Sequence, residues 1–137
     1  MTNDYNTKLV EEFRANDGRV GGPWEATPLI LVHDIGAKSG IEHVTPLGCF
    51  PQGDGHFLVV ASNGGSPTHP AWFHNLKANP SVDVEVGDEV FTAVAEELGE
   101  TARAELWPQL AARAPQINDH QAKVIRQIPV VMLTRKD

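Results

Sequence analysis

Residues 59–80, VVASNGGSPTHPAWFHNLKANP, hold more groups able to bind or react than a surface loop requires. An apolar run stops at Ser62, a pair of glycines follows Asn63, and His69, Trp72 and His74 come soon after. A glycine-rich turn exposes backbone N–H groups, which can bind the carbonyl edge of a planar ligand. These residues equally allow a plain tight turn with the aromatic side chains in the core.

A second candidate is the segment GAKSG, residues 36–40. Its two glycines permit a tight turn with exposed N–H groups, Lys38 adds a positive charge and Ser39 adds a hydroxyl, a combination suited to a phosphate or another anion. An ordinary surface turn with a solvated lysine remains the alternative. The segment is not a Walker motif, because that motif has a longer glycine spacing before its lysine and a helix after it.

The histidines do not show the spacing of a metal site. None belongs to an HExxH motif, the single cysteine offers no Cys pair, and His69 and His74 are five residues apart, which in a helix would place them on different faces. We therefore expect no metal. Ser62 is not in a G-x-S-x-G elbow, so no nucleophilic triad is visible in the sequence.

Composition limits the class of protein. The 137 residues have the length of one domain, and the net charge of −7 argues against binding to nucleic acid, which needs a basic surface. Cys49 is the only cysteine, so no internal disulfide can form. The N-terminus has no apolar run of signal-peptide length, and nothing approaches the ~18 apolar residues of a membrane span. We expect a cytoplasmic protein without stable membrane insertion.

Hydrophobic patterning predicts an α+β chain. Helices are expected over 6–16, 70–79, 100–113 and 116–125, and strands over 28–32, 43–50, 56–62 and 129–135, with a hairpin over 81–98 that turns at Gly87-Asp88. Pro46 should push its strand to an edge or a bulge. The continuous run PLILV indicates a strand covered on both faces. Six strands in this order suit a mostly antiparallel sheet curled into a small barrel with flanking helices.

Four segments occur together in one order with tight spacing: EEFRANDGRVGG, PLILVHDIGAKSGIEHVTPL, VVASNGGSPTHPAWFHNLKANPSVDVEVGDE and RQIPVVMLTRK. This combination resembles the deazaflavin-dependent nitroreductase family of actinobacteria, over residues from about Leu9 to Arg135. The resemblance implies a split β-barrel that binds coenzyme F-420. It also implies one deazaflavin-binding domain over 1–137, with its N-terminal helix within 1–17.

The resemblance also implies a cofactor site built from matched positions. The phosphate end would lie at Ala37, Lys38 and Ser39, and the next strand would line the cofactor through His43, Val44, Thr45, Pro46, Leu47 and Gly48. The ring edge would meet Val60, Ala61, Ser62 and Asn63. The start of the following helix would supply Ala71, Trp72, Phe73, His74 and Asn75, and His120 would close the pocket.

The implied reaction is hydride transfer to a nitroaromatic, a quinone or an enone, with Ser62 and His120 as candidate proton or hydrogen-bond donors. The family commonly has Arg where Ala37 stands, a basic residue at His43, Lys at Asn63 and Tyr at His120. These departures leave two alternatives open: an FMN-binding reductase on the same barrel, or a non-catalytic carrier of a cofactor or ligand. A homodimer is possible.

Overall fold

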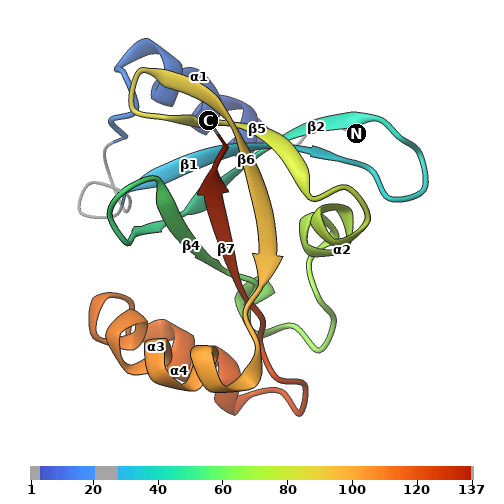
Figure 1. Cartoon of the computed structure of the whole chain (residues 1–137), viewed down its shortest axis with the longest axis vertical. Coiled ribbons are helices and arrows are strands. Elements are labelled where there is room, and N and C mark those ends of the chain that lie inside the picture. Colours follow the sequence, from blue (N-terminus) through green and yellow to red (C-terminus); the bar gives the residue numbers. More distant parts are fainter. Residues whose placement is uncertain (1–3, 21–27, 137) are drawn as a thin grey trace.

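A single antiparallel sheet forms the centre of the fold (Figure 1). The structure, a computed structural model, describes residues 4–20 and 28–136. The strands run β2-β1-β5-β6-β7-β4-β3 across the sheet. Their bounds are β1 (Leu29–Ile35), β2 (Glu42–Gly48), β3 (Phe50–Pro51), β4 (His56–Val60), β5 (Ser81–Val86), β6 (Glu89–Glu97) and β7 (Val130–Arg135).

The two edges of this sheet are consecutive parts of the chain. β2 pairs with β1 at one edge, β3 pairs with β4 at the other, and only Cys49 separates β2 from β3. The sheet must therefore curl on itself, which confirms the predicted α+β antiparallel barrel with flanking helices. Seven strands replace the predicted six because the expected strand over 43–50 breaks at Cys49, whose N–H turns to the Pro28 carbonyl at 2.9 Å. Pro46 lies on the edge strand β2, as predicted.

The apolar run in β1 is buried on both sides, as its composition predicts. Ile30 and Val32 enter the cluster inside the barrel, whereas Leu29 and Leu31 enter a second cluster with Leu9. Because successive side chains of a strand point to opposite faces, each face of β1 has its own cover.

The helices are α1 (Asp4–Ala15), α2 (Ala71–Ala78), α3 (Glu100–Arg113) and α4 (Gln116–Ala122), together with the short 3-10 turn η2 (Asn63–Gly65). Figure 1 shows α1 at one end of the barrel and α3 with α4 at the opposite end. A third apolar cluster, which includes Phe50, Leu110 and Ile117, joins α3 and α4 to the sheet. The α4 helix ends before its predicted limit at Ile125, whose side chain is fully exposed. None of the described helices has the length and hydropathy needed to cross a membrane.

The end of α1 docks against the β5–β6 hairpin by backbone contact. Gly18 has a φ of +93°, and its N–H donates to the Phe13 carbonyl at 2.7 Å, a typical helix C-terminus. A Cβ built on Gly18 would come within 2.6 Å of the Gly87 Cα. A side chain at position 18 would clash with the backbone of Gly87, so this contact between the end of α1 and the hairpin turn requires glycine at position 18.

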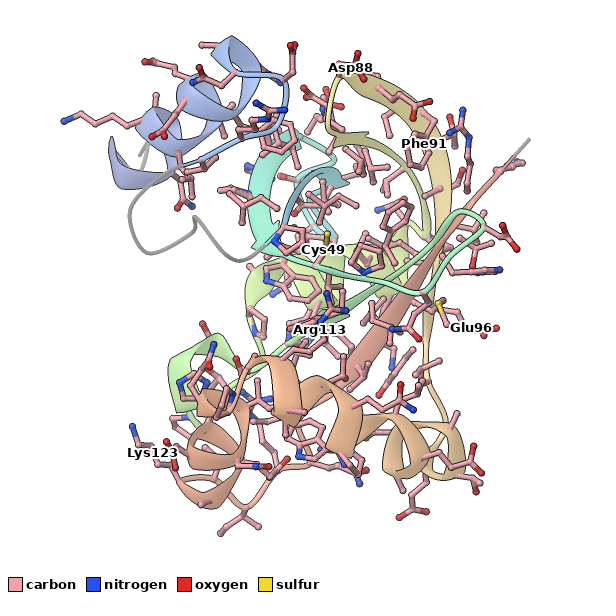
Figure 2. All side chains as sticks on the ribbon, turned by 90° about the vertical axis from the view of Figure 1, so that its left-hand side faces the viewer. Cys49, Asp88, Phe91, Glu96, Arg113 and Lys123 are labelled. Atoms are coloured by element: carbon pink, nitrogen blue, oxygen red, sulfur yellow. The ribbon has the colours of Figure 1, made fainter. Side chains whose placement is uncertain are left out.

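Cys49 lies inside the barrel between α1 and the α3–α4 layer (Figure 2). Its side chain is buried, and this burial raises the pKa of the thiol to about 12. A buried thiol with a raised pKa is a core residue rather than a nucleophile.

Candidate functional site

A cleft of about 780 Å³ opens between α1, the β1–β2 pair and α2. Six residues predicted to bind a cofactor line it: His43, Val44, Thr45, Ala71, Trp72 and Asn75. The opposite wall is one face of α1, formed by Asn6, Thr7, Val10, Glu11 and Arg14. The other face of α1 buries Leu9 and Phe13 in the apolar cluster beneath. This packing fixes the rotation of the helix, so that its remaining face lines the cleft.

The floor of the cleft is a buried carboxylate, Asp34, with 1% of its surface exposed. The Thr45 hydroxyl donates to Asp34 Oδ1 and the Asn75 amide donates to Asp34 Oδ2, each at 2.7 Å. The Asn75 carbonyl oxygen in turn accepts the Ala37 backbone N–H at 2.9 Å. Asp34 therefore connects β1, β2 and α2, and through Asn75 it fixes the start of the loop over residues 36–40.

This loop is compact and leaves its lysine available. Gly36 and Ile41 close it through a backbone hydrogen bond of 2.8 Å, and the Ser39 hydroxyl accepts the Ile41 N–H at 3.1 Å. A Cβ on Gly36 would lie 2.3 Å from the Ser39 hydroxyl oxygen, so a larger residue there would displace that hydroxyl. Lys38 is exposed and has no hydrogen bond or ion pair with any residue that the structure describes. It can bind an anion without breaking an existing contact.

Arg14, the basic residue of the α1 wall, is already paired. Arg14 donates to both carboxylate oxygens of Glu85, at 3.1 and 2.6 Å, and His33 bridges Glu85 and Glu42 at 2.7 and 3.1 Å. The hydrogen bond from Arg14 is the main cause that lowers the pKa of Glu85. Arg14 thus anchors α1 to β5, and most of its charge is neutralised before any ligand arrives.

The glycine-rich loop after β4 meets a helix from the far end of the chain. Asn63, with a φ of +49°, donates from its side chain to the Thr68 carbonyl at 3.0 Å. A Cβ on Gly65 would lie 3.4 Å from the His120 Cα, which shows how closely α4 covers the turn. The Nδ1 atom of His120 is buried and has no hydrogen-bond partner in the part of the chain that the structure describes. An unpartnered buried nitrogen beside this loop suits a ligand contact.

The other predicted residues, His120 included, are absent from the lining of the cleft, and Val60 packs against the cluster beneath α3 and α4. Ala37 and Ser39 belong to the exposed loop, Pro46, Leu47 and Gly48 continue β2, Val60 ends β4, and Ala61 and Ser62 follow it. Leu47 packs against the barrel core, and Ala61 is fully buried. These roles in cofactor binding stay predictions.

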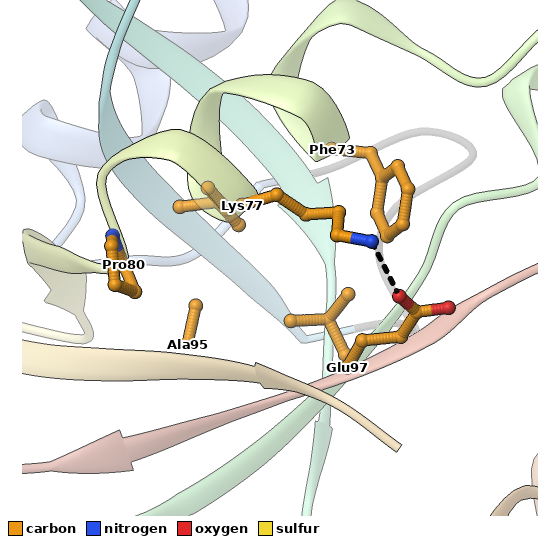
Figure 3. Close-up of a pocket in the computed structure, with 7 residues that line it drawn as sticks. Phe73, Lys77, Pro80, Ala95 and Glu97 are labelled. Carbon is orange, nitrogen blue, oxygen red and sulfur yellow. Dashed lines mark ion pairs between the residues drawn. The ribbon is translucent and has the colours of Figure 1, made fainter. Parts of the chain in front are cut away.

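Phe73 belongs to a second, smaller cavity of about 240 Å³ on the other side of α2. Figure 3 shows the Lys77 ammonium between the Phe73 ring and the Glu97 carboxylate. The ammonium lies 3.2 Å from Glu97 and 5.5 Å from the ring centre. The short helix α2 therefore lines two cavities.

The reasoning that separated His69 from His74 by helical spacing is wrong, because α2 begins only at Ala71. His69 lies before the helix, and the two imidazole rings are 5.7 Å apart. Within residues 4–20 and 28–136 there is still no group of three or more His, Cys, Asp or Glu side chains that could hold a metal.

Sequence reasoning missed Asp34, Arg126 and the polar face of α1. Asp34 carried a usable signal, since an acid inside the run PLILVHDI must be buried with partners if the strand is covered on both faces. Arg126 had no such signal, because its contacts are with backbone carbonyls about sixty residues away.

Comparison with known proteins identifies the family. The sequence profile described as "F-420H(2)-dependent quinone reductase" matches residues 6–135. An F-420H(2)-dependent quinone reductase of Mycobacterium tuberculosis is 38% identical over 128 residues, which cover 90% of this chain and 85% of that protein. The chain belongs to the F-420H(2)-dependent quinone reductase family. This membership confirms the family resemblance that the motifs indicate.

Two solved structures support the same fold. One, an F-420-H2 dependent reductase called FDR-A, is 38% identical, with a TM-score of 0.69 over 77% of this chain and 93% of that one. Another, described as a domain-swapped dimer, is 32% identical, with a TM-score of 0.72 over 95% of this chain and 97% of that one.

The site fits the cofactor that the family name implies. The walls combine apolar surface from Val10, Val44 and Trp72, suited to a planar ring, with polar groups on the floor. Lys38 has no partner among the described residues and lies on a loop tied to the cleft through Ala37, where an anionic tail could be held. Outside the lining, His120 Nδ1 is a buried polar atom that lacks a partner among residues 4–20 and 28–136.

We expect Asp34→Asn to destabilise the protein by about 1–3 kcal/mol, because the new amide can accept only one of the two hydrogen bonds and leaves the other donor facing an NH₂ group. Urea unfolding measures the change. The matched control is Asp83→Asn, since Asp83 accepts from Thr92 at 2.9 Å in an exposed pair of the same kind. The control should change stability by less than about 0.5 kcal/mol. Equal effects in the two variants would show that the Asp34 network does not support the cleft.

Proposed function

We propose that this chain transfers hydride from reduced coenzyme F-420 to a quinone or a similarly electron-poor small molecule. Membership of the family confirms the predicted F-420-dependent oxidoreductase. The observation that carries the finer proposal is the cleft itself, in which residues from α1, β1, β2 and α2 meet. Asn75 of this cleft binds the loop that carries Lys38, a lysine with no partner among the described residues. Quinones are favoured over nitroaromatics and enones because the relatives carry that substrate in their names.

When bound, F-420 supplies the hydride, and the protein supplies position and a dry environment. Lys38 would hold the anionic end, because the N–H groups of Gly36, Ala37, Gly40 and Ile41 in its loop already donate within the chain. Trp72 and Val44 form an apolar wall that excludes water, and Asp34 keeps Thr45 and Asn75 in fixed orientations. This rigid floor reduces the ordering cost of binding, which is a general source of affinity.

Hydride addition leaves negative charge on an oxygen of the acceptor, so a nearby donor lowers the barrier. Ser62 and His120 are the proposed donors. His120 is supported by its buried, unpartnered Nδ1 and by its place over the turn at Gly65. Ser62 is half-buried at the end of β4.

A homodimer remains part of the proposal, and its support is the 32% identical relative described as a domain-swapped dimer. The molar mass in solution tests it. One deazaflavin-binding domain over 1–137 and a cytoplasmic location stay predictions.

The proposed function is tested by titrating the purified protein with F-420 and with FMN, read by tryptophan fluorescence because Trp72 lines the cleft. We expect saturable quenching by F-420, with FMN at least about tenfold weaker. Reduced F-420 should then be consumed when a soluble naphthoquinone is added. Tighter binding of FMN would indicate a flavin enzyme, and F-420 binding without turnover would indicate a carrier.

Lys38→Ala should raise the F-420 dissociation constant about tenfold, or about 1.4 kcal/mol, at low ionic strength, because an unpaired cation near the phosphate is lost. Lys136→Ala is the control, since Lys136 is another exposed lysine and follows β7, which does not line the cleft. An unchanged constant for Lys38→Ala would place the phosphate elsewhere.

Quinone reduction by the wild type should depend on pH if His120 supplies a proton, because a proton donor is active in only one of its protonation states. His120→Gln should remove this dependence while it keeps a polar side chain. His56→Gln is the matched control, because His56 pairs with Thr134 at 3.2 Å on the β4–β7 strands. Identical profiles for the wild type and His120→Gln would exclude a proton role for His120.

A further inference from the structure

One arginine holds the glycine-rich loop from the opposite end of the sequence. Arg126 lies between α4 and β7, and its Nε donates to the Ser66 carbonyl at 3.0 Å. Its Nη2 donates to the Ser62 carbonyl at 2.9 Å, and its Nη1 donates to the Ala61 carbonyl at 3.3 Å and to His69 Nδ1 at 2.9 Å. The guanidinium therefore contacts the chain on both sides of η2.

These contacts determine the shape of the loop. The turn has two hydrogen bonds of its own, from the Gly65 N–H to Ser62 and from the Ser66 N–H to Asn63. Arg126 adds the bonds that set the separation between the end of β4 and the residue after the turn. A planar guanidinium can hold several carbonyls in fixed directions, whereas the compact ammonium of lysine cannot reproduce that fork.

The contact with His69 requires a neutral imidazole. Arginine has no acceptor, so His69 Nδ1 must accept the hydrogen bond and cannot carry a proton. Burial is the main cause that lowers the pKa of His69 from 6.5, and the charge of Arg126 lowers it further. The other groups that act on His69 are His74 and Lys77 of α2, which also lower the pKa, and Glu97 of β6, which raises it. Its ring packs on Phe73 at 4.8 Å, beside the cavity of Figure 3.

The Arg126–His69 contact should weaken as the pH falls, because it needs a neutral His69. A histidine whose pKa is lowered in the folded state favours folding most when it is neutral, so the contact is complete above pH 6.5. It is lost as the pH falls below that value through the lowered pKa, because a second donor and a second positive charge then face Arg126.

We propose that Arg126 is a positioning residue that holds residues 61–69 in the form needed to bind the cofactor, and that neutral His69 is required for this hold. The link to the cofactor rests on the proposed function. The restraint of residues 61–69 by Arg126 does not depend on the proposed function, because each of its hydrogen bonds is made within the chain.

The first test is hydrogen–deuterium exchange of residues 61–69 without cofactor, corrected for intrinsic rates, at pH 7.5 and pH 5. We expect wild-type exchange to be about tenfold faster at the lower pH, and Arg126→Lys and Arg126→Gln to exchange fast at both. His69→Asn should remain slow at both, because the amide oxygen can accept from Arg126 and cannot be protonated in this range. Slow exchange in Arg126→Gln, or a pH effect that persists in His69→Asn, would overturn the proposal.

The second test is the F-420 dissociation constant of the same proteins. Arg126→Lys should weaken binding about tenfold at pH 7.5, and the wild type should weaken to a similar degree at pH 5 whereas His69→Asn should not. Faster exchange without any loss of affinity would overturn the positioning role. If the wild type binds no F-420, the proposed function fails, and exchange still decides whether Arg126 holds the loop. Because His69→Asn keeps the acceptor, it remains informative if the Arg126 variants fail to fold.

Discussion

The fold depends on one constraint: a single stretch of chain supplies both edge strands of the sheet, so the sheet has to curl. Residues 42–51 pair with β1 through β2 and with β4 through β3, so the same stretch forms both edges. The sheet curls until its two edge strands, β2 and β3, follow each other along the chain with only Cys49 between them. The fold also brings the loop before β2 to α2, where Asn75 accepts the Ala37 N–H from a position 38 residues away in the chain.

Within that frame, buried hydrogen bonds rather than surface charges set the geometry of the cleft. Asp34 accepts hydrogen bonds from Thr45 of β2 and Asn75 of α2, and Asn75 in turn accepts the Ala37 N–H. The cost of burying this carboxylate is offset only because both oxygens are satisfied. The site is therefore rigid where it meets the barrel and open where Lys38 projects.

The charge balance of the cleft differs from what an anionic cofactor would ordinarily meet. Arg14 is committed to Glu85, Glu11 adds a negative charge to the wall, and Ala37 and Asn63 bring no charge. In a chain of net charge −7, the proposed binding of an anionic cofactor would rely on Lys38 and on apolar contact with the ring. Long-range attraction should contribute less than in a basic site, and the fit of the walls should contribute more.

The sequence alone determined the strands, the hairpin at Gly87-Asp88, the double burial of β1 and the family, because hydrophobic period, turn residues and motif spacing are local properties. It also identified six residues of the cleft lining through the motifs. Only the tertiary structure decided that the strand over 43–50 breaks at Cys49, since closure requires that stretch to change partners. Only the tertiary structure showed Asp34 as the common acceptor and brought Arg126 to the carbonyls of residues 61, 62 and 66. Contacts between distant segments depend on how the barrel closes, and no local pattern of residue types encodes them.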